Sequence, residues 1–200
     1  MKFGNDYQLN ETDGNFLSNC HCSIFETNDE AIAKIIILLK NHKVVGVIRG
    51  RSEFGPRALC SRSILANPMK DDVNDSINVR LNRTEFMPFG PVVAENIAPN
   101  CFIDWSSDIN GKFMTQIFQC SKQLRQTSPA VVHVDNTTRP QVINKHEDHF
   151  LYDLLNAWYK ETGCHSLINT SPPVMCNASS FSKSPCKSYE STLCACITPS

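Results

Sequence analysis

The sequence lacks both a strong charge of either sign and a long hydrophobic run. Its 200 residues contain 19 Lys and Arg against 20 Asp and Glu, which gives a net charge of −1 and an isoelectric point near 6.6. We therefore expect no nucleic-acid partner held by bulk positive charge. No stretch reaches the roughly 20 apolar residues of a membrane span. The first 19 residues contain four charged side chains and no apolar segment typical of a signal peptide, so we expect a cytoplasmic protein.

The spacings that favour a metal centre are also missing. The ten cysteines include two close pairs, Cys20 with Cys22 and Cys194 with Cys196, and both are C-x-C rather than the C-x-x-C typical of zinc sites. The histidines show no H-x-x-x-H spacing. A disulfide framework needs a secreted context. We therefore predict reduced thiols and no dedicated metal site, with a zinc site as the alternative.

What the sequence does contain is a dense group of arginines after an apolar run. The segment Gly46–Leu65 reads GVIRGRSEFGPRALCSRSIL and contains Arg49, Arg51, Arg57 and Arg62. The preceding apolar residues predict a buried strand at 44–49, and the glycines and proline that follow predict a tight loop. Arginine presents a planar fork of donors that suits phosphate or carboxylate. The segment therefore favours an anion site; the alternative is a surface loop with solvated charges.

Helical and strand patterns alternate along the chain. A capping box at Thr27–Glu30 and apolar residues at i, i+3, i+4 and i+7 predict a helix at 29–42. Further helices are predicted after Asp71 or Asp72 and at 150–158, the latter ending at Gly163. The other predicted strands are 91–94, 112–118, 130–134 and 165–169. This alternation indicates a single α/β domain.

Two more polar groups follow apolar runs. The first is His133–Arg139, reading HVDNTTR, and the second is Asn169–Ser171, reading NTS. Polar side chains at strand ends lie where ligands bind in open α/β sheets. For the first group the alternative is a polar turn, because Asp, Asn and Thr are ordinary turn residues.

Four ordered blocks resemble the C-terminal domain of carbamoyltransferases, a family that includes nodulation-type and antibiotic O-carbamoyltransferases. The blocks are GRSEFGPRAL with SRSILANP, LNRTEFMPFGPVV, AVVHVDNTTRPQVI and HSLINTS. The resemblance implies a YrdC-like fold, a twisted mixed α/β sheet flanked by helices with a nucleotide cleft. It places a lead-in at 1–28, the domain at 29–171 and a divergent, irregular C-terminal segment at 172–200.

The resemblance also implies a site and its ligands. ATP, with Mg²⁺ bound through its phosphates, and carbamoyl phosphate are the expected ligands, and no protein metal site is implied. Arg57, Arg62 and Arg139 are the expected catalytic residues. The nucleotide is assigned to Arg139, Asn169 and Ser171, and the phosphate and carbamate oxygens to Arg57, Arg62 and Arg83. For Arg83 the alternative is a pair with Glu85 or with the adjacent helix.

The chain departs from the family pattern at several positions. Cys60 stands where the family usually has glycine, and Asn136–Thr138 replaces a Gly-Thr-Ala sequence. Met87 replaces a family residue near the phosphates, and Pro172-Pro173 follows Ser171 where an asparagine-bearing loop is usual. Prolines donate no backbone hydrogen bond and stiffen this loop. These changes predict an impaired site.

The implied function is formation of carbamoyl-adenylate from carbamoyl phosphate and ATP. In the family, an ATPase-like acyl-transfer domain performs the final transfer, and we expect it in cis or trans. One alternative is a catalytically inactive fragment or a module that binds nucleotide or phosphate without turnover. Another is an enzyme like the threonylcarbamoyl-adenylate synthases that serve transfer RNA modification, although the near-neutral charge disfavours direct RNA contact.

Overall fold

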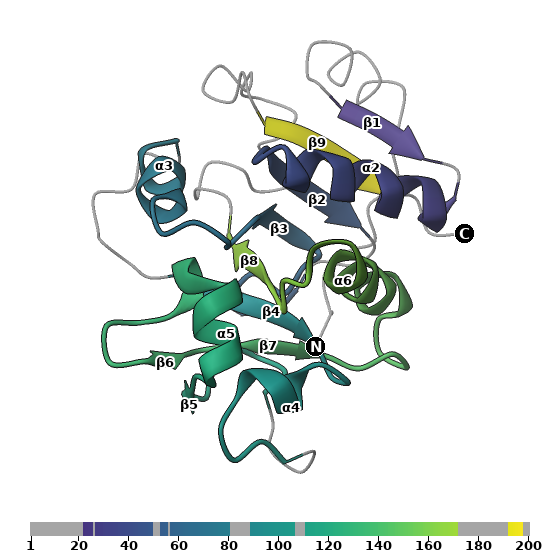
Figure 1. Cartoon of the computed structure of the whole chain (residues 1–200). Coiled ribbons are helices and arrows are strands. Elements are labelled where there is room, and N and C mark those ends of the chain that lie inside the picture. The colour runs from purple at the N-terminus through teal and green to yellow at the C-terminus, as the bar shows by residue number, and fades with distance from the viewer. Residues whose placement is uncertain are drawn as a thin grey trace.

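The protein folds around a mixed sheet of seven strands in the order β1-β9-β2-β3-β8-β4-β7, and β5 and β6 form a separate two-stranded sheet (Figure 1). The computed structural model describes residues 22–25, 27–49, 53–55, 57–80, 89–106, 111–171 and, as backbone, 192–197. The strands are β1 Cys22–Phe25, β2 Val44–Arg49, β3 Arg62–Ala66, β4 Gly90–Ala94, β5 Phe118–Gln119, β6 Thr137–Thr138, β7 Gln141–Ile143, β8 Leu167–Thr170 and β9 Thr192–Ile197. The helices are α2 Asn28–Lys40, α3 Val73–Arg80, α4 Ala98–Cys101, α5 Lys122–Thr127 and α6 His149–Thr162, with a 3₁₀ helix at Pro129–Val131.

The pairing confirms the predicted mixed sheet flanked by helices. β2 pairs antiparallel with β3, and β8 pairs antiparallel with both β3 and β4. The pairs β4–β7, β2–β9 and β1–β9 are parallel. β9 comes from the segment 172–200 that was expected to be irregular, and it lies between β1 and β2. The rest of that segment and the lead-in before residue 22 lie outside the described residues.

Helices α2 and α6 pack against each other over the sheet (Figure 1). The Thr27 side chain accepts the Glu30 N–H at 3.3 Å and begins α2. Asp148 accepts the Leu151 N–H at 3.1 Å and begins α6, which ends at Gly163 with φ +71°. Both helices bury one apolar face, as their sequence periodicity predicts.

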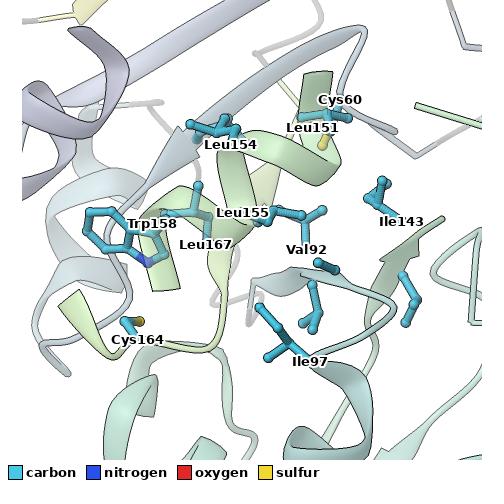
Figure 2. Packing of buried hydrophobic residues seen from close by; sticks show 14 of the residues in the cluster. Cys60, Val92, Ile97, Ile143, Leu151, Leu154, Leu155, Trp158, Cys164 and Leu167 are labelled. Carbon is cyan, nitrogen blue, oxygen red and sulfur yellow. The ribbon is translucent and has the colours of Figure 1, made fainter. Parts of the chain in front are cut away.

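The core beneath α6 combines helix and strand side chains. Leu151, Leu154, Leu155 and Trp158 of α6 lie in one cluster with Leu167 of β8 (Figure 2). The Trp158 ring is fully buried, and its Nε1 donates to the Ser166 carbonyl at 3.0 Å. This contact fixes α6 against the start of β8 and so positions the strand that carries Asn169.

Two strand predictions were wrong. Residues 112–117 form turns, and the strand begins only at Phe118. Residues 130–134 form the end of the 3₁₀ helix and a turn, because the Val132 N–H bonds the Pro129 carbonyl at 3.0 Å. Ala130 and Val131 are apolar because they are buried in the core, not because they lie in a strand. The predicted strand 165–169 is shifted to Leu167–Thr170, and β1, β3, β6, β7 and β9 were not predicted.

Candidate functional site

The register of β8 brings three strand ends to one edge of the sheet. Asn169 of β8 is opposite Leu65 of β3 on one side and Gly90 of β4 on the other. Because β8 is antiparallel to both neighbours, its end lies beside their starts. β7 is parallel to β4, so its start lies at the same edge. We call this the strand-end edge.

The strand-end edge gathers four of the predicted site residues. Arg62 begins β3, Asn169 and Ser171 lie at the end of β8, and Arg139 precedes β7 by two residues. Arg57 lies on the loop before β3 and its side chain is exposed. Of the other positions singled out, Arg51, Arg83, Met87 and Pro172-Pro173 lie outside the described residues.

The loop before β3 is organised by Glu53. Its Oε1 accepts the backbone N–H groups of Leu59, Ser61 and Arg62 at 2.8, 3.2 and 3.1 Å. Three N–H groups converging on one carboxylate oxygen form a charge-assisted anchor. Sequence reasoning missed this role, since an isolated glutamate in a loop gives no signal of its own.

The arginines of this segment have different roles. Arg49 Nη1 lies 2.5 Å from Asp148 Oδ2, and its guanidinium lies 5.0 Å from the centre of the Phe150 ring. Arg49 therefore fixes the N-terminus of α6 to the end of β2. Arg62 Nη1 donates to the carbonyls of Arg49 at 3.0 Å and Ser61 at 2.9 Å. Arg62 thus holds the loop closed, whereas the exposed Arg57 is accessible to a ligand.

Asn169 ties three segments together inside the sheet. It is 2% exposed, and its Nδ2 donates to the Ala58 carbonyl at 2.8 Å and to Gln141 Oε1 at 2.7 Å. Gln141 Oε1 also accepts from Cys60 Sγ at 3.4 Å. Sequence reasoning missed Gln141, although a polar residue between Pro140 and an apolar pair was a signal that could have found it.

The two departures from glycine fall on left-handed backbone. Cys60 has φ +65° and Asn136 has φ +60°. Glycine adopts this conformation without a steric cost, and asparagine tolerates it better than most residues. Asn136 therefore keeps the turn before Arg139, while the fully buried Cys60 holds a conformation that costs roughly 1–2 kcal/mol for a residue with a Cβ.

The segment before Arg139 is a hydrogen-bonded turn. Asp135 Oδ1 accepts the Thr137 N–H at 3.0 Å and the Thr137 hydroxyl at 2.6 Å. These bonds hold the pKa of Asp135 below its ordinary value. The His133 N–H donates to the Thr137 carbonyl at 2.8 Å, and burial lowers the pKa of His133. The turn alternative therefore accounts for Asp135–Thr137, and Arg139 lies beyond it.

Gly90 lets β4 approach Arg139. A Cβ on Gly90 would lie 2.6 Å from the Arg139 carbonyl oxygen and 2.2 Å from Met114 Cε. Both distances are far shorter than a van der Waals contact. Gly90 therefore sets the position of the Arg139 backbone relative to β4 and Asn169.

Several other findings concern alternatives to this site. Within the described ranges, no helix is long and apolar enough to cross a membrane, and no three His, Cys, Asp or Glu side chains gather as metal ligands. Cys60, Cys101, Cys120 and Cys164 are buried reduced thiols, and burial raises the pKa of Cys120 to about 11.

A hollow of about 200 Å³ lies at the opposite edge of the sheet, where β2 starts and β3 ends, and its lining includes His42, Lys43, Asn67, Lys70 and Ser76.

Comparison with known proteins gives consistent matches. The family model described as "Carbamoyltransferase C-terminus" matches residues 36–188. An uncharacterized protein of Methanocaldococcus jannaschii is 37% identical over 70% of this chain and 28% of its own length. Nodulation protein NolNO of Sinorhizobium fredii is 35% identical over 73% of this chain and 22% of its own length. Nodulation protein U of Rhizobium tropici is 35% identical over 70% of this chain and 24% of its own length.

Among solved structures, full-length HypF in the phosphate- and nucleotide-bound form matches with a TM-score of 0.43 and 14% identity. The match covers 70% of this chain and 17% of that one. The chain spans between 22% and 28% of the length of the three sequence relatives.

Proposed function

The chain belongs to the carbamoyltransferase C-terminal family, and from this premise we propose that it binds ATP and carbamoyl phosphate at the strand-end edge and forms carbamoyl-adenylate. The observation that carries the proposal is the convergence of Arg62, Arg139, Asn169 and Ser171 at one edge of the sheet. These residues are far apart in sequence and belong to three of the four blocks that resemble the family. Donor groups and hydroxyls at strand ends suit phosphate-bearing ligands.

The proposed chemistry has two steps. Water cleaves carbamoyl phosphate into phosphate and carbamate. A carbamate oxygen then attacks the α-phosphorus of ATP. The bond between the α-phosphorus and the oxygen that links it to the β-phosphorus breaks, and pyrophosphate leaves with that oxygen. Phosphoryl-type transfers depend on positioning and on stabilisation of charge rather than on a protein nucleophile.

The structure supports different roles for the candidate residues. We assign the exposed Arg57 to phosphate oxygens and the half-buried Arg139 to phosphate and carbamate oxygens. Arg62 adds positive charge while it holds the loop. Asn169 and Ser171 contact the adenylate in this proposal, and Arg83 remains a predicted phosphate ligand. Mg²⁺ enters with ATP and keeps mostly water and phosphate ligands.

Transfer to an acceptor is proposed for another domain. The relatives are several times longer than this chain, which supports an ATPase-like acyl-transfer domain acting in cis or trans. The acceptor would then be bound by that domain, and carbamoyl-adenylate would be the product of this one.

A second candidate is a module that binds nucleotide or phosphate without turnover. It is favoured by the two backbone carbonyls that already occupy Arg62 Nη1, because those bonds compete with a ligand phosphate. The Pro172-Pro173 sequence after Ser171 favours it as well. A threonylcarbamoyl-adenylate synthase differs in needing threonine for adenylate formation.

Exchange of labelled pyrophosphate into ATP separates these candidates. We expect exchange that is slow but depends on carbamoyl phosphate, that does not need threonine, and that is lost in Arg139→Ala. Lys40→Ala is the control, because Lys40 lies on α2 and pairs with Glu161 at 3.3 Å. ATP binding without exchange would support the binding module. Absence of both ATP binding and exchange in the folded protein would contradict the proposal.

A further inference from the structure

Buried oxygens without hydrogen-bond partners cluster at the strand-end edge. Glu53 Oε2, Ser61 Oγ and Asn169 Oδ1 are buried and have no partner within the described part of the chain. Glu53 and Asn169 hold the same peptide unit from its two sides, since Glu53 accepts the Leu59 N–H and Asn169 donates to the Ala58 carbonyl. Buried polar groups are nearly always satisfied, so such a cluster calls for an explanation.

The orientation of the Asn169 amide follows from its partners. The Ala58 carbonyl is an acceptor only, so the amide nitrogen must face it. Gln141 Oε1 then receives the second N–H of the same nitrogen. Asn169 Oδ1 consequently points away from both partners. It is an acceptor that needs a hydrogen-bond donor, on a side chain that is only 2% exposed.

We infer that Asn169 Oδ1 accepts an N–H from the amino group of the carbamoyl ligand and thereby selects a carbamoyl group over an acyl group of the same shape. A phosphate or carboxylate oxygen offers no donor and would be repelled by this oxygen. The carbamoyl –NH₂ is the donor-bearing part of carbamoyl phosphate. Glu53 Oε2 is a second buried acceptor, on the side chain that binds the same peptide unit through Oε1. It makes this part of the edge still more favourable to N–H groups.

The amino group of adenine is the other donor that the proposed ligands carry. The depth of Asn169 favours the smaller carbamoyl group, because Asn169 lies within the sheet, with Leu65 and Gly90 as its strand neighbours. A site that hydrogen-bonds a substrate N–H strongly rejects an analogue without it, since the buried acceptor is then left unpaired. This inference rests on the proposed function and names the residue that sets its specificity.

Acetyl phosphate provides the test, since it carries a methyl group where carbamoyl phosphate carries the amino group. Affinities of the full chain for freshly dissolved carbamoyl phosphate and for acetyl phosphate are measured by calorimetry with ATP and Mg²⁺. We expect the unaltered protein to prefer carbamoyl phosphate by roughly tenfold or more. In Asn169→Ala we expect the preference to fall below about threefold, mainly through weaker binding of carbamoyl phosphate.

Asn67→Ala is the matched control. Asn67 is also a buried asparagine whose Nδ2 donates to a backbone carbonyl, that of Leu39 at 3.2 Å, but its Oδ1 is satisfied by the Met69 N–H at 2.9 Å. It should lose stability and keep the preference. Where Asn169→Ala does not fold, Asn169→Val replaces it, because a β-branched side chain suits a strand. Where neither folds, the preference of the unaltered protein decides.

The outcomes separate this inference from the proposed function. Binding of both phosphates without preference, or a preference that survives in the Asn169 variant, overturns the inference alone. A different result would assign Asn169 Oδ1 to the adenine amino group and would also overturn the inference. In that case the Asn169 variant no longer discriminates between ATP and inosine triphosphate but keeps the preference for carbamoyl phosphate. Binding of neither phosphate by the folded, unaltered protein overturns both.

Discussion

Substitution of Gly90 by alanine tests whether the approach of β4 to Arg139 builds the site. The new Cβ would lie 2.6 Å from the Arg139 carbonyl oxygen, and ordinary contact begins at 3.4 Å. The Arg139 backbone must therefore move by about 0.8 Å, since a carbonyl cannot rotate away as the end of the Met114 side chain can. Overpacking of this kind costs about 1–3 kcal/mol.

The same displacement should weaken the ligand site. A misplacement of about 1 Å near reacting groups can cost about a hundredfold in rate. We expect Gly90→Ala to lower the free energy of unfolding in urea by about 1–3 kcal/mol and to weaken ATP binding in calorimetry. Gly111→Ala is the matched control, because its Cβ would meet only side chains, Val142 Cγ2 at 2.9 Å and Trp105 at 3.3 Å. It should lose stability and keep ATP affinity. Equal ATP affinities for Gly90→Ala and the unaltered protein would show that the close approach of β4 to Arg139 does not build the ligand site.

Three further predictions concern the fold. Arg49→Met removes the ion pair with the buried carboxylate of Asp148, so we expect the free energy of unfolding in urea to fall by about 3 kcal/mol; an unchanged midpoint would show that the pair is unimportant. Burial lowers the pKa of His165 below 6.5, so the stability that neutral His165 contributes is full above pH 6.5 and is lost as the pH falls through and below that value. His165→Gln should flatten this part of the curve of stability against pH. An unaltered curve would contradict the assignment of this pH dependence to His165. Truncation after Ser171 removes β9, which pairs with all six residues of β2. We therefore expect a lower melting temperature than for the full chain, and equal melting temperatures would show that β9 is dispensable.

The three longest helices, α2, α3 and α6, were the most predictable part of the fold, whereas the short helices α4 and α5 were not predicted. The sequence placed one at 29–42 and the structure has it at Asn28–Lys40, because a cap and an amphipathic period are local signals. α6 and its Gly163 stop follow the same logic. Strands were harder. The strand β3 was hidden inside the arginine-rich motif, and β7 has only three residues after Pro140, so neither shows a clear alternation.

The sequence motifs predicted most of the residues of the site but not the hydrogen bonds that connect them. Arg62, Arg139, Asn169 and Ser171 were singled out from polar residues after apolar runs and from the family resemblance, and the sheet register brings them to one edge. Glu53 and Gln141 were missed, because their roles depend on backbone groups that come together only in three dimensions. The division between a structural Arg49 and an exposed Arg57 also required the structure.

The most direct test of the strand-end site is a nuclear magnetic resonance titration of the ¹⁵N-labelled protein with ATP and Mg²⁺. We expect amide shifts concentrated at 57–63, at Arg139–Gln141 and at Asn169–Ser171, and no shifts around the hollow at the opposite edge of the sheet. Shifts gathered instead at His42, Lys43, Lys70 and Ser76, which line that hollow, would contradict the strand-end site.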